Sequence, residues 1–295
     1  MAFSNGSKST DAPVIKKYTG IATVSVVGFN PTLDELNKIY GKKFTTEPKY
    51  VDKDDNGNDR VRLDFYIKTD PDAHKDAEDK PLDLISRVSI YLSNIPNSNK
   101  DATKFQIIDV YGRTAWATSE EIEAKAIPQY KNGAANIDPL YRKAYYGEEA
   151  LIDFLIAYIN ISSPATFNQD TREWTMKSGE ELALCKASLE HIDNYFKGDF
   201  SEIKTILEYQ PNNKIKVLFG VDTDKMYQKV YSRRFQKTAS NDSEAKFKKE
   251  IEDAKSRGSL ATIDYTFGPL QEYTVAATNF DKPADTVAPA DVPWS

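Results

Sequence analysis

The sequence predicts an α+β protein in which antiparallel strands flank a helical middle segment. Apolar and polar residues alternate in several short stretches on either side of that segment, as they do in strands with one buried face. The middle stretch instead has apolar residues at helical spacing. We expect one domain over 18–275 with a helical insertion at about 119–210, a disordered polar arm at 1–17, and a disordered acidic tail with an aromatic tip at 276–295.

Composition limits the classes of function. The chain has 295 residues, 40% of them hydrophobic, so it is long enough to form a core. Its net charge of −6 argues against a surface that is basic overall. The acids are concentrated in stretches such as 52–59 and 70–83, so a local basic strip remains compatible with nucleic-acid binding.

Cysteine usage and hydropathy predict the cellular location. The single cysteine, Cys185, excludes an intramolecular disulfide, which fits a reducing compartment. Neither a secretory signal nor an apolar stretch of membrane-spanning length is visible. We therefore expect a soluble cytoplasmic protein with no membrane partner.

Four stretches before residue 119 are predicted strands: 19–29, 59–68, 86–94 and 104–118. In the second stretch the apolar residues face inward, and Arg62 and Tyr66 face outward. The third repeats the pattern with Arg87 and Tyr91 on its outward face. We expect the fourth stretch to be a bent or bulged strand that is broken at Gly112.

Helices are predicted from capping residues and from the 3.6-residue period. A capping box of Thr32 and Glu35 begins a short helix that Gly41 ends, and Thr118 with Glu121 begins a helix at 119–127. Further helices are predicted at 147–161, 178–198, 200–210 and 240–258. Strands are predicted at 214–221 and 260–267.

Cations and aromatic rings alternate along residues 225–237. The row consists of Lys225, Tyr227, Lys229, Tyr231, Arg233, Phe235 and Lys237. A strand that follows the apolar stretch 214–221 after a short turn would place all seven side chains on one face. A helix capped by Asp222 is the alternative, and it would make the rings part of an ordinary apolar stripe.

As a strand, the row predicts a face open to water, because burying four unpaired cations is energetically unfavourable. Unpaired bases could stack on the rings at about 1–3 kcal/mol per base, and the cations could contact phosphates. Other outward residues would extend this surface if their strands adjoin: Arg62, Tyr66, Arg87, Tyr91, Tyr111, Arg113 and Trp116. The alternative is an amphipathic hairpin whose Lys and Arg stems cover aromatic surface.

Motifs for metals and catalysis are incomplete. Asp52, Asp54, Asn56 and Gly57 match the start of a calcium loop, but Leu63 stands where that loop needs a bidentate Glu. The two histidines have no partner at zinc-ligand spacing, and no nucleophile elbow, phosphate loop or dinucleotide fingerprint occurs. We expect no catalytic residue, metal or cofactor, and a metal-dependent nuclease stays a minor alternative.

Three stretches carry a resemblance to a known family: FQIIDVYGRTAW at 105–116, VLFGV with YQKVYSRRF within 217–235, and ADVPWS at 290–295. With them the chain resembles phage-encoded single-stranded DNA-binding proteins, of the kind found in crAss-like phages of gut Bacteroidetes. The resemblance implies an antiparallel OB-like β-barrel that binds single-stranded DNA without catalysis during phage replication and recombination, in the host cytoplasm. It also implies docking of replication proteins on the tail, here through Asp291, Pro293 and Trp294. A virion structural or assembly protein is the alternative.

Overall fold

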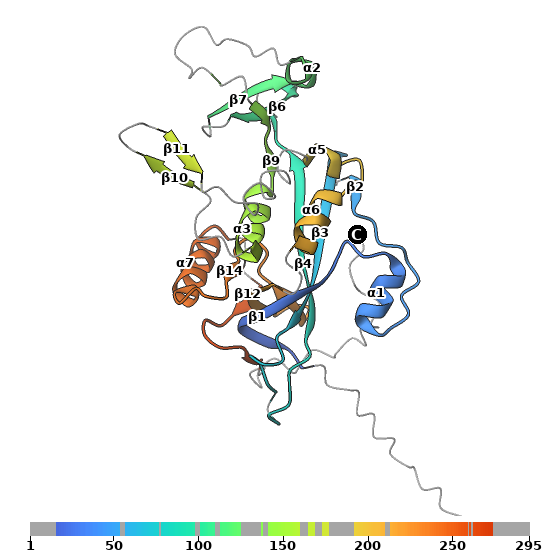
Figure 1. Ribbon diagram of the computed structural model, residues 1–295, viewed down its shortest axis with the longest axis vertical. Helices are drawn as coiled ribbons and strands as arrows, with labels where there is room; N and C mark the ends of the chain where they lie inside the picture. The colour runs from blue at the N-terminus through green and yellow to red at the C-terminus, as the bar shows by residue number, and fades with distance from the viewer. Residues whose placement is uncertain are drawn as a thin grey trace, which may run out of the picture.

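The structure, a computed structural model, describes residues 16–53, 57–76, 78–97, 101–109, 113–124, 137, 141–159, 165–168, 173–176, 192–209, 213–258, 260 and 262–273. Within these ranges the chain folds as a mixed α+β protein (Figure 1). The predicted tail at 276–295 therefore lies outside the described residues, and so does the predicted arm apart from residues 16 and 17. So do the predicted site residues Tyr111, Asp291, Pro293 and Trp294.

The main sheet is antiparallel and curls into a half-barrel, which confirms the predicted fold class at this coarse level. Its strands follow the order β13-β12-β1-β3-β4-β9. Their bounds are β1 (Tyr18–Phe29), β3 (Asp59–Thr69), β4 (Ile85–Asn94), β9 (Tyr145–Tyr146), β12 (Lys214–Asp222) and β13 (Tyr227–Val230). Because the sheet curls, Cα atoms of β13 and β4 come within 8 Å of each other, although four strand pairings separate them along this path.

Short strands complete the sheet. β2 (Val51–Lys53) pairs with β3, and β16 (Gln271–Glu272) pairs with β1. β14 (Gln236–Lys237) and β15 (Ile263–Tyr265) both pair with β12. Strand β12 thus pairs with one segment that precedes the C-terminal helix and one that follows it.

Helices pack on both faces of the sheet. On the inner face lie α3 (Glu148–Ile159), α5 (Ile192–Tyr195) and α6 (Ser201–Tyr209), whose apolar residues belong to the main core. On the outer face lie α1 (Leu33–Tyr40), against β1 and β3, and α7 (Ser243–Ser256), against β12 (Figure 1). No helix in the described part of the chain has the length and hydropathy to cross a membrane.

The alternation predicted for β3 determines which of its side chains belong to the inner core. Leu63, Phe65 and Ile67 have no exposed surface, and the Phe65 ring lies 4.0 Å, centroid to centroid, from Phe154 of α3. Burying a side chain of this size contributes about 1.5–3 kcal/mol each. The period of two therefore fixes which residues of β3 face outward, among them Arg62.

The predicted caps of α1 are confirmed. The backbone N–H of Thr32 donates to Glu35 Oε2 at 2.8 Å, and the Glu35 N–H donates back to Thr32 Oγ1 at 3.4 Å. Gly41 adopts a left-handed conformation after the last turn. Thr118 and Glu121 cap α2 (Ser119–Glu123) in the same way.

A second sheet contradicts one strand prediction. It contains β5 (Pro96–Asn97), β6 (Asp101–Asp109), β7 (Thr114–Thr118) and β8 (Tyr141–Lys143). β6 and β7 pair antiparallel, with Lys104 opposite Thr118 and Ile108 opposite Thr114. The stretch 104–118 is therefore a hairpin and not one bent strand, because a glycine at position 112 suits a chain reversal as well as a bulge.

The described part of the middle segment contains strands as well as helices. Helices α2, α3 and α6 lie within the predicted ranges, and α5 is the described part of the range 178–198 that is helical. However, β8 and β9 also lie there, together with a separate hairpin of β10 (Ala165–Asn168) and β11 (Glu173–Met176). These strands were not predicted, since runs of two to four residues are too short to show alternation.

Candidate nucleic-acid interface

The row of cations and rings at 225–237 is not one continuous strand. β13 ends at Val230, β14 begins at Gln236, and the residues between them are irregular. The segment does not form the alternative helix either. Lys225 lies in the exposed turn that precedes β13, so it is not part of the strand.

Two of the three rings predicted to stack are buried. Tyr231 is 4% exposed and packs with Phe247 of α7, whereas Phe235 is 2% exposed and packs edge-on against Phe154 of α3 at 5.1 Å. The prediction of one water-facing surface is therefore wrong for Tyr231 and Phe235. The Tyr231 N–H still donates to the Leu218 carbonyl of β12 at 2.9 Å, so Tyr231 stays on the outer face and α7 covers it. The irregular stretch that follows turns Phe235 into the main core on the inner face.

The other members of the row remain at or near the surface. Tyr227 and Lys229 are half-buried on β13, and Lys237 is half-buried on β14. Arg233 is exposed in the irregular stretch.

Two predicted site residues lie in the second sheet. Arg113 precedes β7 and its Nε donates to Asp109 Oδ2 at 2.6 Å. Trp116 lies opposite Gln106 on the neighbouring strand β6. Because β6 and β7 do not pair with the main sheet, these residues do not extend a surface on β3 and β4.

The structure does bring four predicted residues together. β3 and β4 pair antiparallel, with Arg62 opposite Tyr91 and Tyr66 opposite Arg87. Residues directly opposite each other in such a pair point to the same face. All four therefore belong to the outer face of the sheet, where the side chain of Tyr91 is 44% exposed.

Two residues outside the predicted set complete this surface. Arg60 lies opposite Ser93 of β4, which in turn lies opposite Tyr146 of β9. Tyr146 is therefore a diagonal neighbour of Tyr91 on the same face, a spacing of about 7–8 Å. The Arg60 guanidinium lies 5.2 Å from the centroid of the Tyr91 ring, and Tyr146 is 57% exposed.

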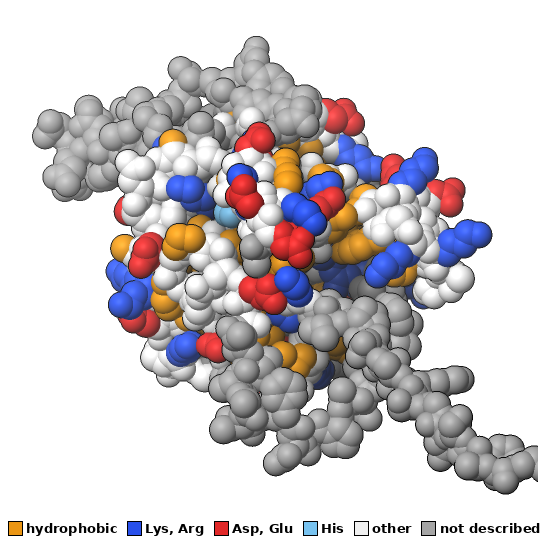
Figure 2. Space-filling view, turned by 90° about the horizontal axis from the view of Figure 1, so that it is seen from below, with side chains coloured by type: hydrophobic (Ala, Val, Ile, Leu, Met, Phe, Trp, Pro, Cys, Tyr) orange, Lys and Arg blue, Asp and Glu red, His pale blue; other side chains and the backbone are white. Residues whose placement is uncertain are grey.

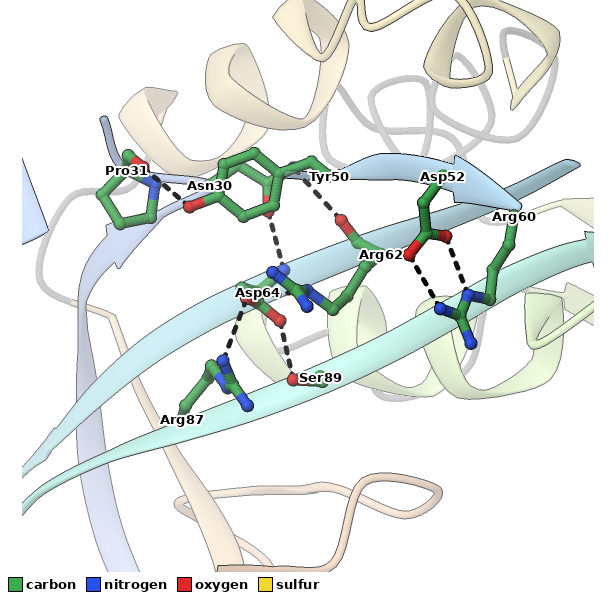
Figure 3. A network of polar contacts seen from close by, with 9 residues as sticks. All are labelled: Asn30, Pro31, Tyr50, Asp52, Arg60, Arg62, Asp64, Arg87 and Ser89. Atoms are coloured by element: carbon green, nitrogen blue, oxygen red, sulfur yellow. Dashed lines mark hydrogen bonds and ion pairs between the residues drawn. The ribbon is translucent and has the colours of Figure 1, made fainter. Parts of the chain in front are cut away.

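We call this surface the arginine–tyrosine face. Its members are Arg60, Arg62, Arg87, Tyr91 and Tyr146. It combines two exposed rings with three guanidinium groups, and Figure 3 shows the three guanidinium groups. Helix α3 packs on the opposite, inner face of the sheet.

A buried carboxylate organises the arginines of this face (Figure 3). Asp64 has no exposed surface; its Oδ2 lies 3.1 Å from Arg62 Nε and 3.5 Å from Arg87 Nη1. Its Oδ1 accepts a hydrogen bond of 2.7 Å from the Ser89 hydroxyl. Two guanidinium groups thus face one carboxylate oxygen. Burial alone would lower the pKa of Arg87, but the neighbouring Asp64 raises it overall.

Arg60 is arranged differently. It makes a bidentate ion pair with Asp52 of β2, at 2.9 Å from Nε and 2.7 Å from Nη2 (Figure 3). The pair is partly exposed, and it holds the guanidinium in place over Tyr91. Bidentate geometry of this kind also suits recognition of a phosphate.

Asn30 and Tyr50 support the cluster from the neighbouring segments. Asn30 Oδ1 accepts from the Asp64 backbone N–H at 2.7 Å, and the Tyr50 hydroxyl donates to the Pro31 carbonyl at 2.7 Å. The Tyr50 ring lies 5.6 Å from the Arg62 guanidinium. Burial raises the pKa of Tyr50, so its phenol remains neutral and does not offset the positive charge.

The position of Tyr66 corrects part of the prediction. Its side chain faces outward, but it is only 2% exposed because Tyr40 of α1 packs edge-on against it at 5.9 Å. No base can stack on a ring that is covered in this way. Arg62 is also only 7% exposed, so it offers little surface to a ligand.

Sequence patterns contained only part of the signal for this face. Arg60 lies at the end of the predicted strand 59–68, beside the acids of 52–59. Tyr146 lies in a two-residue strand that shows no alternation. Neither residue can be linked to Tyr91 without the registers of β3, β4 and β9.

Cations and acids are mixed on another part of the surface. The end of the molecule seen in Figure 2 carries cations and acids side by side. Across the described residues, no three His, Cys, Asp or Glu side chains are grouped so that they could hold a metal ion. No family model matches the chain, and no curated protein or solved structure matches it either.

Proposed function

We propose that this protein binds single-stranded DNA without catalysis, on the arginine–tyrosine face. The observation that carries the proposal is the register that makes two exposed rings, Tyr91 and Tyr146, diagonal neighbours on the face that carries Arg60 and Arg87. Exposed rings on a sheet provide stacking surfaces for unpaired bases, at about 1–3 kcal/mol per base. This stacking does not depend on the base sequence of the strand.

The proposed division of roles follows exposure. Tyr91 and Tyr146 stack on bases, while Arg60 and Arg87, with side chains 28% and 19% exposed, contact phosphates. Arg62 and Asp64 orient Arg87. Local positive charge allows such binding although the chain as a whole carries −6.

The proposal also includes an OB-like fold and a role in phage replication. A curled antiparallel sheet is compatible with an OB-like barrel, whose outer strand faces bind single strands in other proteins. The resemblance to phage single-stranded DNA-binding proteins supports a role in phage replication and recombination in the host cytoplasm, with replication proteins as partners of the C-terminal segment.

The test is a titration of labelled oligo-dT, oligo-dA and duplex DNA, followed by fluorescence anisotropy at 50 and 200 mM salt. We expect a preference for single strands that tolerates sequence. Tyr91→Ala and Tyr146→Ala should each weaken binding about 5- to 150-fold, the equivalent of one stacked base. Arg60→Gln should reduce the salt dependence by about 0.7 in the log–log slope, one phosphate contact to a single strand.

Tyr227→Ala is the matched comparison, since Tyr227 is an aromatic residue of the original row that remains partly exposed. It should leave binding unchanged. A loss with Tyr227→Ala and none with Tyr91→Ala or Tyr146→Ala would move the binding surface to residues 225–237. The absence of binding to any strand would refute the proposed function.

A further inference from the structure

The segment 41–50 connects α1 to β2 and lies beside the arginine–tyrosine face (Figure 1). It begins next to Tyr40, whose ring packs on Tyr66 of β3. It ends at Tyr50, whose carbonyl oxygen accepts the Arg62 backbone N–H at 2.8 Å. Arg62 and Tyr66 are four residues apart on β3, so the two ends of the segment lie beside points of this strand that are about 13 Å apart.

The segment lies on the side of β3 that faces away from the two exposed rings. β4 pairs along one edge of β3, so β2, which pairs with the same strand, occupies its other edge. The segment leads into β2, whereas Tyr91 lies on β4 and Tyr146 lies on β9, beyond β4. The arginines of β3, Arg60 and Arg62, therefore lie between the segment and the rings.

Side-chain contacts hold the segment in place. Asn37 of α1 binds the backbone of Phe44 twice: its Oδ1 accepts from the N–H at 2.5 Å, and its Nδ2 donates to the carbonyl oxygen at 3.4 Å. The Phe44 ring packs edge-on against Tyr40 at 5.7 Å. Glu47 Oε1 accepts the Leu33 backbone N–H at 3.4 Å. Because the segment is held in this way, less conformational entropy is lost when a ligand binds to it.

The charged side chains of the segment are three exposed lysines and one acid. The lysines make no ion pair with a described residue; they are Lys42, Lys43 and Lys49. The acid, Glu47, already accepts a hydrogen bond from the first residue of α1. The sugar–phosphate backbone of a single strand carries one negative charge per nucleotide, so a row of cations beside a stacking surface suits this ligand.

We propose that the segment 41–50 binds the sugar–phosphate backbone of the single strand, with Lys42, Lys43 and Lys49 in contact with phosphates. The backbone then lies on the side of α1 and β2, and the bases extend across β3 toward Tyr91 and Tyr146. β4 lies two strand spacings, about 10 Å, from β2, and a nucleotide spans such a distance from phosphate to base. This inference rests on the proposed function and adds the orientation of the bound strand.

The test compares oligo-dT with an abasic oligonucleotide of the same length, which has the backbone but no bases. Fluorescence anisotropy gives the affinities between 50 and 200 mM salt. The segment variant Lys42→Gln/Lys43→Gln/Lys49→Gln should reduce the log–log salt slope by about 2 for both ligands, which corresponds to three phosphate contacts to a single strand. Tyr91→Ala should weaken the binding of oligo-dT and leave that of the abasic strand unchanged, because its ring contacts bases only.

The matched control is Lys225→Gln/Lys248→Gln/Lys255→Gln, which removes the same charge at exposed positions in the turn before β13 and on α7. It should leave the salt slope unchanged. Both triple variants should unfold at the wild-type temperature, since all six side chains are exposed.

Two outcomes would overturn this inference while the proposed function stands. One is a wild-type salt slope in the segment variant with oligo-dT still bound. The other is the same decrease of the slope in both triple variants, because the effect would then come from the net charge of the protein. Absence of binding by the wild type to either ligand would instead refute the proposed function, and this inference with it.

Discussion

Arg62 and Asp64 lie two residues apart on the outer face of β3, and Arg62 Nε approaches Asp64 Oδ2 to 3.1 Å in surroundings almost without water. The same carboxylate oxygen faces Arg87 of the next strand. One buried anion thus holds two cations on the candidate binding face, so the stability of the fold and the geometry of that face depend on the same residue.

Replacement of Asp64 should be strongly destabilising. Asp64→Asn leaves two guanidinium groups buried without their anion, and loss of one partner of a buried pair costs about 3–5 kcal/mol. Urea unfolding followed by circular dichroism measures this. Asp59→Asn is the control, because its pair with Lys53 is more than half exposed and contributes about 0–1 kcal/mol. Similar unfolding free energies for both variants would contradict the buried-anion interpretation.

Gly147 should tolerate no side chain. Its φ of +85° disfavours other residues, and an added Cβ would overlap the carbonyl oxygen of Tyr91. Gly147→Ala should therefore cost about 2–4 kcal/mol and displace the junction of β4 and β9. Gly41→Ala serves as the control. Gly41 also has a positive φ, but it has open space, so about 1 kcal/mol is expected. Equal losses of thermal stability would show that the close contact with Tyr91 is relieved at no cost.

Phe235 should behave as a core residue. Phe235→Ala removes a ring that is 2% exposed and packed against Phe154, so it should cost about 3–5 kcal/mol. Tyr227→Ala, from the same row but half-buried, should change stability by less than about 1 kcal/mol. Denaturant midpoints of the two variants measure the difference. A stable Phe235→Ala variant with lost DNA binding would restore the original interpretation of the row.

Stability should fall as the pH decreases through the range in which His74 titrates. The Thr23 backbone N–H donates to His74 Nε2 at 2.8 Å, which requires a neutral ring, and burial lowers the pKa of His74 below its usual 6.5 although Asp70 opposes this. The unfolded chain then binds more protons, so this contribution is complete above about pH 6.5 and is lost as the pH falls through the lower, folded-state value.

The variant His74→Gln isolates this effect, since its amide oxygen can accept the same hydrogen bond without titrating. Unfolding free energies should be measured from pH 7.5 to 5. The decrease in stability should be smaller for His74→Gln than for the wild type over this interval. Parallel curves for the two proteins would show that His74 does not contribute to the acid sensitivity.

Local patterns predicted the elements well where the cause was local. Thr32 and Glu35 cap α1 through atoms three residues apart, and β3 alternates because one of its faces is buried along its length. The stretch 104–118 was predicted wrongly because Gly112 fits both a bulge and a reversal. Which of the two occurs depends on the pairing of β6 with β7, and this pairing is not encoded in the spacing of residues.

The row at 225–237 shows the limit of periodicity. Alternation places side chains on one face only while the strand continues. The last backbone hydrogen bond of this part of the row to β12 runs from the Tyr231 N–H to the Leu218 carbonyl, and pairing resumes at Gln236. In the gap the chain follows the packing of α3 and α7, which draws Phe235 and Tyr231 into separate clusters.

By itself, the sequence determined the strands and helices with strong periods, the caps of α1 and α2, and the outward direction of Arg62, Arg87 and Tyr91, because these depend on neighbours within a few residues. Only the tertiary structure decided which outward rings stay exposed and which residues meet. Tyr91 and Tyr146 become neighbours through strand register, and Tyr66 is covered because α1 packs on it. Such contacts join residues far apart along the chain, so their free energies depend on the whole fold.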